Sequence, residues 1–95
     1  MTEQQIIETL ATMVMGWEEI SSWSWIEREA GRKIYKGAWN PLQNIADAWQ
    51  VVEKFDDYKV GKDWCRLYRD DEDWFVWGFE TSQKAICMAA LKSVA

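Results

Sequence analysis

Apolar residues recur at helical spacing near the start of the chain. Four of them are separated by three or four positions: Ile6, Leu10, Val14 and Trp17. This spacing places side chains on one face of an α-helix. Thr2 and Gln5 have the spacing of a capping box, and Gly16 is a suitable residue to end a helix. The pattern therefore predicts a helix from about Thr2 to Met15.

The pattern changes to alternation after this helix. The segment SSWSWIERE, residues 21–29, alternates in steps of two, and KIYKGAW, residues 33–39, resumes with aromatic and β-branched residues. Such segments are typical of β-strands, and glycine favours the turn between them. We therefore predict two short strands joined at Gly31.

A second helix is predicted after the only proline of the chain. Pro41 keeps Asn40 out of the helical region but is itself compatible with a first helical turn. Asn44, followed by Asp47, offers a second possible helix start. The helix is expected to extend to about residue 55. Its apolar stripe consists of Leu42, Ile45, Trp49, Val52 and Phe55.

Two tryptophans in this region have different expected roles. Trp49 shares the helical stripe with Val52, so burial between the helix and a sheet is expected. Trp39 precedes the helix and does not follow its spacing. It therefore either covers the helix start or faces a pocket.

The second half of the chain predicts a hairpin and a final helix. One strand covers Trp64–Arg69, the acidic residues 70–73 form the turn, and the return strand covers Trp74–Glu80. Both faces of this hairpin carry bulky apolar residues, so it is covered on both sides or exposed on one side to a partner. The last helix begins near Thr81 or Ser82. Its buried face consists of Ile86, Cys87, Ala90, Leu91 and Val94.

The order of these elements is helix, two strands, helix, two strands, helix. Three helices around one antiparallel sheet give an α+β fold, a three-layer α/β/α sandwich. A chain of 95 residues is sufficient for one such domain, residues 1–95.

Composition and charge narrow the classes of function. The chain has no histidine, which removes the usual general base and the commonest metal ligand. We therefore expect no enzyme, no metal site and no cofactor. The net charge of −5 disfavours long nucleic acid as a partner. Cys65 and Cys87 are expected to be buried free thiols, and the acidic run at 70–73 a solvated turn.

No apolar run is long enough to span a membrane, and the N-terminus lacks the basic region of a signal peptide. The protein is therefore expected to stay in the compartment where it is made.

Three blocks of the sequence resemble the phage ABA sandwich domain family. They are MVMGW at residues 13–17, WNP at 39–41 leading into NIADAWQVVEKF at 44–55, and ETSQKAICMAALKSV at 80–94. The resemblance implies α/β/α layering and a phage protein acting in the cytoplasm of its bacterial host. It supplies no catalytic residues. Many small phage proteins counter bacterial defence, some by sequestering nucleotide immune signals.

The tryptophan-rich hairpin is the predicted ligand site. Eight tryptophans occur in the chain, and four of its eleven basic residues fall within positions 28–36. Indole rings stack on bases, while cations and a helix N-terminus attract phosphate. The candidate ligand-binding residues are Trp23, Trp25, Arg28, Arg32, Lys36, Trp39, Asn40 and Asn44. A solvated surface or an oligomer contact is the alternative interpretation.

Two hypotheses of function follow. The first is a non-enzymatic phage protein that binds and sequesters a small anionic ligand, such as a nucleotide-type immune signal. The second is an interaction module that docks on a bacterial host protein through an aromatic surface and inhibits it. A small core cannot easily bury this many aromatic residues, so a homo-oligomer is also expected.

Overall fold

The computed structural model describes residues 1–95 and has the α+β composition expected from the sequence. Six strands form two antiparallel three-stranded sheets, β1-β2-β3 and β4-β5-β6. The elements are α1 (Glu3–Thr9), η1 (Leu10–Val14), β1 (Glu18–Ser21), β2 (Ser24–Glu27), β3 (Arg32–Tyr35), η2 (Lys36–Ala38), α2 (Ile45–Val52), β4 (Asp57–Val60), β5 (Trp64–Arg69), β6 (Glu72–Trp77) and α3 (Ser82–Ser93).

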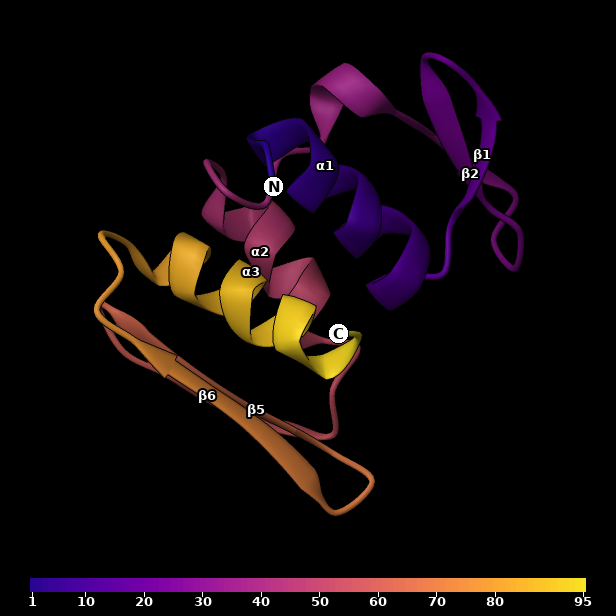
Figure 1. Ribbon diagram of the computed structural model, residues 1–95. Coiled ribbons are helices and arrows are strands. Elements are labelled where there is room, and N and C mark those ends of the chain that lie inside the picture. The colour runs from indigo at the N-terminus through magenta and orange to yellow at the C-terminus, as the bar shows by residue number, and fades with distance from the viewer.

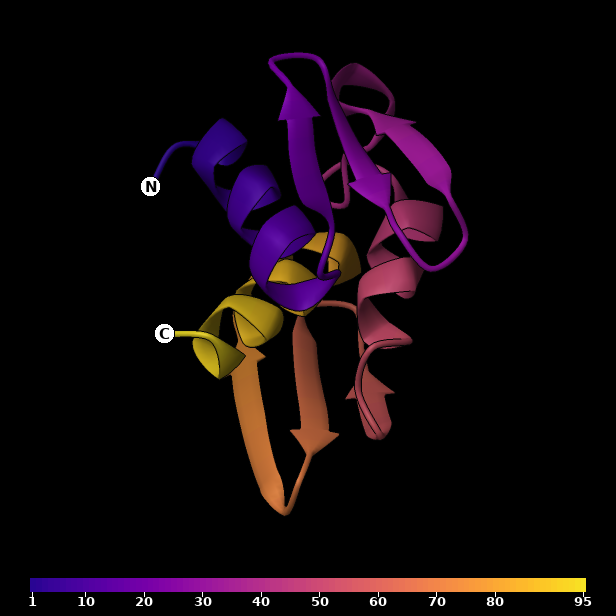
Figure 2. The same ribbon diagram turned by 90° about the vertical axis from the view of Figure 1, so that its right-hand side faces the viewer.

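The helices lie between the two sheets. Figure 1 shows α3 against one face of the β5–β6 hairpin, with α2 beside α3 and α1 on the side of α3 away from the hairpin. Figure 2 shows the β1-β2-β3 sheet at the opposite end of the molecule from the β4-β5-β6 sheet. An α+β sandwich is therefore confirmed, but its strands form two sheets of three instead of one sheet of four.

The first helix confirms the predicted capping. The Thr2 backbone N–H donates to Gln5 Oε1 at 2.8 Å, and the Gln5 backbone N–H donates to Thr2 Oγ1 at 3.1 Å. The helix continues as the π-helix η1, in which Met15 N–H donates to the Leu10 carbonyl at 2.9 Å. It ends at Gly16, whose φ of 75° is readily adopted only by glycine.

Helix α2 begins after Asn44 and not at Pro41. Asn44 Oδ1 accepts hydrogen bonds from the backbone N–H groups of Ala46 at 2.9 Å and Asp47 at 3.2 Å. Asp47 Oδ2 in turn accepts from the Asn40 N–H at 2.9 Å. The second of the two predicted starts is therefore the real one, because it satisfies the free N–H groups of the first turn.

The buried face of α2 differs from the predicted stripe. Ala48, Val51 and Val52 are buried, whereas Trp49 is 37 % exposed and its ring packs edge-on against Tyr58. The predicted burial of Trp49 is therefore wrong. The small side chain of Ala48 allows α2 and α3 to approach closely, and a tryptophan at the helix interface would hold them apart.

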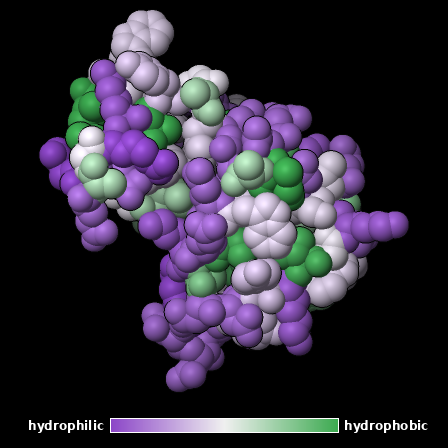
Figure 3. Space-filling model, turned by 180° about the vertical axis from the view of Figure 1, so that it is seen from behind, coloured by the Kyte–Doolittle hydropathy of each residue, from purple (hydrophilic) through white to green (hydrophobic).

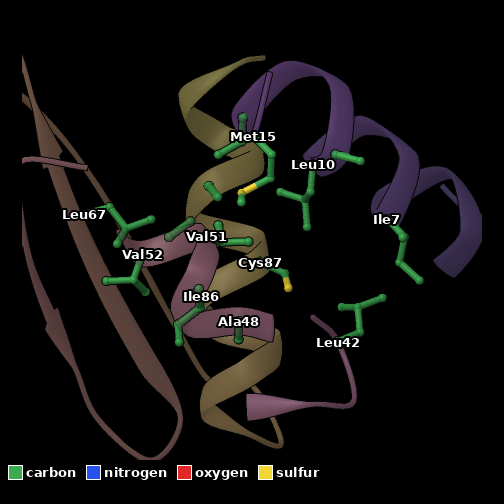
Figure 4. Close-up of a cluster of buried hydrophobic side chains, with 14 of the residues drawn as sticks. Ile7, Leu10, Met15, Leu42, Ala48, Val51, Val52, Leu67, Ile86 and Cys87 are labelled. Atoms are coloured by element: carbon green, nitrogen blue, oxygen red, sulfur yellow. The ribbon is translucent and has the colours of Figure 1, made fainter. Parts of the chain in front are cut away.

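The core joins all three helices to the second sheet. Figure 4 shows Val52 of α2 pointing toward Leu67 of β5, and Leu10 of η1 on the side of α3. Both cysteines are buried free thiols, as predicted. Three small residues of α3 are also fully buried: Ala85, Ala89 and Ala90.

The β5–β6 hairpin has a tighter turn than expected. Asp70 and Asp71 have φ of 53° and 66°, which is the two-residue type I′ geometry. Aspartate tolerates this left-handed region better than most residues. Glu72 and Asp73, predicted to lie in the turn, therefore belong to β6 and pair with Arg69 and Tyr68.

Candidate functional site

Two of the three predicted stacking tryptophans lie in the core. Trp25 is fully buried and Trp39 is 4 % exposed. They form one cluster with Trp17, in which ring centroids are 4.8 Å apart for Trp17 and Trp39 and 6.0 Å apart for the other two pairs. Trp39 Nε1 also donates to Gln50 Oε1 at 3.0 Å. These rings therefore pack against one another and offer no open face for a base.

The three cations proposed as ligand contacts all pair with carboxylates of the chain. Arg28 binds Glu18, and Arg32 binds Glu27 with Nη2 and Oε2 2.8 Å apart.

Lys36 lies between two acids. Its Nζ binds Glu19 and lies 3.3 Å from Glu8 Oε1. The hydrogen bond to Glu19 is the main reason that the pKa of Lys36 is raised above its ordinary value. An anion at any of these three cations competes with an existing ion pair.

The remaining predicted residues are dispersed. Asn40 Oδ1 accepts from the Leu42 N–H at 3.1 Å, and the side-chain oxygen of Asn44 caps α2, so both are used within the chain. Trp23, in the turn between β1 and β2, is 77 % exposed and faces solvent.

A pocket of about 260 Å³ between β3 and α2 brings Arg32 and Trp39 together, but not the other six predicted residues. A larger pocket of about 380 Å³ lies between α1 and the first sheet. Glu8 and Glu19 line it, so its charge is unsuited to an anion.

A second surface is the uncovered face of the β4-β5-β6 sheet, which the sequence indicated only as a face exposed to a partner and not as a ligand site. Figures 1 and 2 show helices on only one face of this sheet. Alternation along paired strands assigns the side chains of the other face, which we call the open face. It consists of Asp57, Lys59, Trp64, Arg66, Tyr68, Asp73, Phe75 and Trp77.

The strand register arranges the open face in three rows. Lys59, Arg66 and Phe75 pair directly across the three strands and form the cationic row. Trp64 and Trp77 pair on one side of it and form the indole row. On the other side lies the acidic row, Asp57, Tyr68 and Asp73.

The aromatic rings of the open face are in contact. The Phe75 and Trp77 rings stack at 18° with centroids 5.7 Å apart, and the Trp64 and Phe75 centroids are 6.1 Å apart. Trp77 is 71 % exposed. Its ring therefore presents an accessible surface of the kind on which a base stacks.

A pocket of about 320 Å³ on this face is lined only by Lys59, Trp64, Arg66 and Phe75. The Arg66 guanidinium lies over the Phe75 ring, 4.8 Å from its centroid. Arg66 Nε is 3.1 Å from Asp73 Oδ2, which is an ion-pair distance, but the N–H is not aligned and has no hydrogen-bond partner. Lys59 forms no ion pair. Lys59 is therefore free to bind an anion, whereas an anion at Arg66 shares the guanidinium with Asp73 and meets its outer nitrogens, because Nε is buried.

Gly61 positions the Trp64 indole. The backbone N–H of Gly61 donates to the Trp64 carbonyl at 2.9 Å in the β4–β5 turn. A Cβ added at Gly61 would lie 2.0 Å from Trp64 Nε1. The indole therefore rests against the glycine, and its place on the open face depends on the missing side chain.

The signal for this site was incomplete in the sequence. The hairpin pattern indicated bulky residues on both faces of β5 and β6, which allowed an exposed face. Lys59 lies on β4, whose polar–apolar alternation covers only four residues, and its alignment with Arg66 becomes visible only in the paired strands.

No group of three or more histidine, cysteine, aspartate or glutamate residues is arranged to hold a metal ion. No helix has the length and apolar character needed to cross a membrane.

Comparison with known proteins identifies a matching family and a similar crystal structure. The family model described as the phage ABA sandwich domain matches residues 8–91. A crystal structure described as a phage protein from Bacillus cereus ATCC 14579 is similar, with a TM-score of 0.76 and 31 % sequence identity. The match covers 99 % of this chain and 88 % of that one. No curated protein gives a significant match. The fold and these matches agree, and the chain belongs to the phage ABA sandwich domain family.

Proposed function

We propose that this phage protein is non-enzymatic and binds and sequesters a small anionic ligand, a nucleotide-type immune signal, in the cytoplasm of the bacterial host. The site is the open face of the β4-β5-β6 sheet. The observation that carries the proposal is the pocket of about 320 Å³ lined by two cations and two aromatic rings, Lys59, Arg66, Trp64 and Phe75.

The chemistry of this pocket suits a ligand with a planar ring and a negative charge. Stacking of a base on an aromatic side chain contributes about 1–3 kcal/mol and tolerates different bases. Arg66 offers a planar guanidinium to a phosphate, and Lys59, which forms no ion pair, offers its ammonium group. A ligand with few phosphates needs only these two cations, so the negative net charge of the chain does not oppose it strongly.

Two exposed tryptophans provide a matched test. Trp77→Ala removes a ring from the open face, whereas Trp23→Ala removes an equally exposed ring from the first hairpin. The purified protein is titrated with cyclic di- and trinucleotides and ADP-ribose, and both tryptophan fluorescence and melting temperature are measured. A bound ligand raises the melting temperature by mass action.

We expect binding by the wild type and by Trp23→Ala, and loss of binding by at least about tenfold in Trp77→Ala, from the lost stacking. Loss of binding only in Trp23→Ala would move the site to the first hairpin and contradict the choice of the open face. Absence of binding by the wild type to every nucleotide tested would refute the sequestration function.

A docking function is the second candidate, in which the protein binds and inhibits a host protein or pairs with a second copy. Three apolar residues are exposed: Ile45 and Trp49 of α2 and Tyr58 of β4. The ring centroids of Trp49 and Tyr58 are 5.4 Å apart. Figure 3 views the molecule from behind and shows pale and green side chains gathered among hydrophilic ones. Aromatic patches of this kind are enriched in protein interfaces.

Sedimentation velocity of the wild type and of Trp49→Ala separates the two forms of docking. A dimer that dissociates in the variant supports self-association through this patch. A monomeric wild type that binds no nucleotide leaves the host protein as the partner.

A further inference from the structure

The open face changes chemistry from one row to the next along the strands. The indole row holds Trp64 and Trp77, the cationic row follows, and the acidic row with Asp57 and Asp73 comes last. Successive rows on one face are two residues apart, about 6.8 Å along a strand. The face is therefore a strip whose chemistry is aromatic, then positive, then negative.

We infer that this strip selects nucleotides with a single phosphate group over nucleosides, diphosphates and triphosphates. The inference rests on the proposed function and specifies the ligand class of the same site. A base stacked on the indole row places the phosphate of a nucleoside monophosphate one sugar away, at Lys59 and Arg66. A nucleoside lacks the group that these cations bind.

The acidic row sets the upper limit of ligand charge. A chain of two or three phosphates that continues along the strip reaches the carboxylates of Asp57 and Asp73. Like charges at short distance repel, and Asp73 already holds Arg66 with Nε and Oδ2 3.1 Å apart. Each added phosphate beyond the first therefore gains no new cation and meets a carboxylate.

This arrangement predicts a peak of affinity at one phosphate. The net charge of −5 alone would give a steady decrease from adenosine through AMP and ADP to ATP. A simple cationic site would give a steady increase over the same series. A maximum at AMP is expected only where a positive zone is bounded by a negative one.

The test is a titration of the wild type with adenosine, AMP, ADP and ATP at one low ionic strength without divalent cations, followed by tryptophan fluorescence. We expect AMP to bind about fivefold more tightly than both adenosine and ATP, the range of a few exposed charge interactions. Equal or tighter binding of ATP, or of adenosine, would overturn the inference while nucleotide binding itself stands. Absence of binding by all four would also overturn this inference, whereas the proposed function fails only if the cyclic nucleotides and ADP-ribose are not bound either.

Two variants change the net charge equally. Asp57→Asn keeps the Oδ1 that accepts the Tyr58 N–H at 2.8 Å but removes the charge from the acidic row. Glu29→Gln removes a charge from the exposed turn between β2 and β3. We expect the ratio of the affinity for AMP to the affinity for ATP to fall by at least about twofold in Asp57→Asn and to stay unchanged in Glu29→Gln. An equal change in both variants would show a long-range charge effect and overturn the role of the acidic row.

Discussion

Trp39→Ala tests whether the tryptophan cluster is a structural core. Trp39 is 4 % exposed, and its ring lies edge-on against those of Trp17 and Trp25. Removing a buried tryptophan side chain costs about 3–5 kcal/mol, because transfer free energy is lost and a cavity remains. Chains of this length are stable by about 5–14 kcal/mol, so the change consumes a large part of the total.

This loss of unfolding free energy gives a measurable decrease in the melting temperature. A loss of about 4 kcal/mol lowers the melting temperature of a domain of this size by about 20 °C. Trp39→Phe keeps a ring in the cluster but leaves Gln50 Oε1 without its donor, and should cost about 1–3 kcal/mol. Trp23→Ala, at 77 % exposure, should change stability by less than about 0.5 kcal/mol.

Urea unfolding followed by far-ultraviolet circular dichroism measures these differences without relying on the fluorescence of the altered residues. The free energy of unfolding is compared at a common slope m, since a changed slope signals a change in the unfolded or native state. A loss below about 1 kcal/mol in Trp39→Ala would refute the reasoning, because a well-packed ring of this size cannot be removed so cheaply. Trp39 would then be free to serve a ligand.

Three further changes have defined outcomes. Gly61→Ala forces the Trp64 indole off its place, since the new Cβ would lie 2.0 Å from Nε1, and should weaken nucleotide binding several-fold in a fluorescence titration. Burial raises the pKa of the Cys65 and Cys87 thiols to about 12, so Ellman's reagent at pH 8 should react slowly with native protein and rapidly in denaturant. Lys36→Met should flatten the alkaline limb of the pH–stability curve, because the raised pKa of Lys36 stabilises the fold below 10.5 and this contribution is lost as pH rises through the folded-state value.

Each of these has a control or a contradicting result. Gly37→Ala adds a Cβ with nothing within 4 Å, so equal loss of binding in both glycine variants would remove the steric argument for Gly61. Two rapidly reacting thiols in the native protein would contradict their burial. Identical urea midpoints for wild type and Lys36→Met from neutral pH to above pH 10.5 would contradict the role of the Lys36 ion pairs.

The helices and the central turns could be predicted from the sequence because local rules decide them. The Thr2 capping box, the Gly16 stop and the Asn44 cap each depend on residues within four positions. The glycine turn at Gly31, with φ of 63°, joins β2 and β3 as predicted. Local hydrogen bonds and backbone preference were sufficient at these places.

Features that depend on packing between distant segments could not be predicted in this way. Residues 45, 49 and 52 and residues 48, 51 and 52 both follow helical spacing on α2. Only the close packing of α3 against α2 determines that Ala48 is buried and that Trp49 is not. Strand β1, with the sequence EEIS, is exposed throughout and has no apolar alternation, and the alternation of β4 covers only four residues.

The candidate site could not be predicted from the sequence for a related reason. Its cations and rings come from three strands, and their alignment depends on the register that the Asp70–Asp71 turn sets. The predicted site used residues close in sequence, of which Trp25 and Trp39 are buried in the core.

The uncovered side of the second sheet has an evolutionary consequence. Side chains there point away from the helices, so most replacements at positions such as Lys59 or Trp77 cost little folding free energy. The opposite side of the same strands, with Cys65 and Leu67 in the core, tolerates far less change. Selection for recognition of a new molecule can therefore replace the residues on one side of this sheet while the fold is retained.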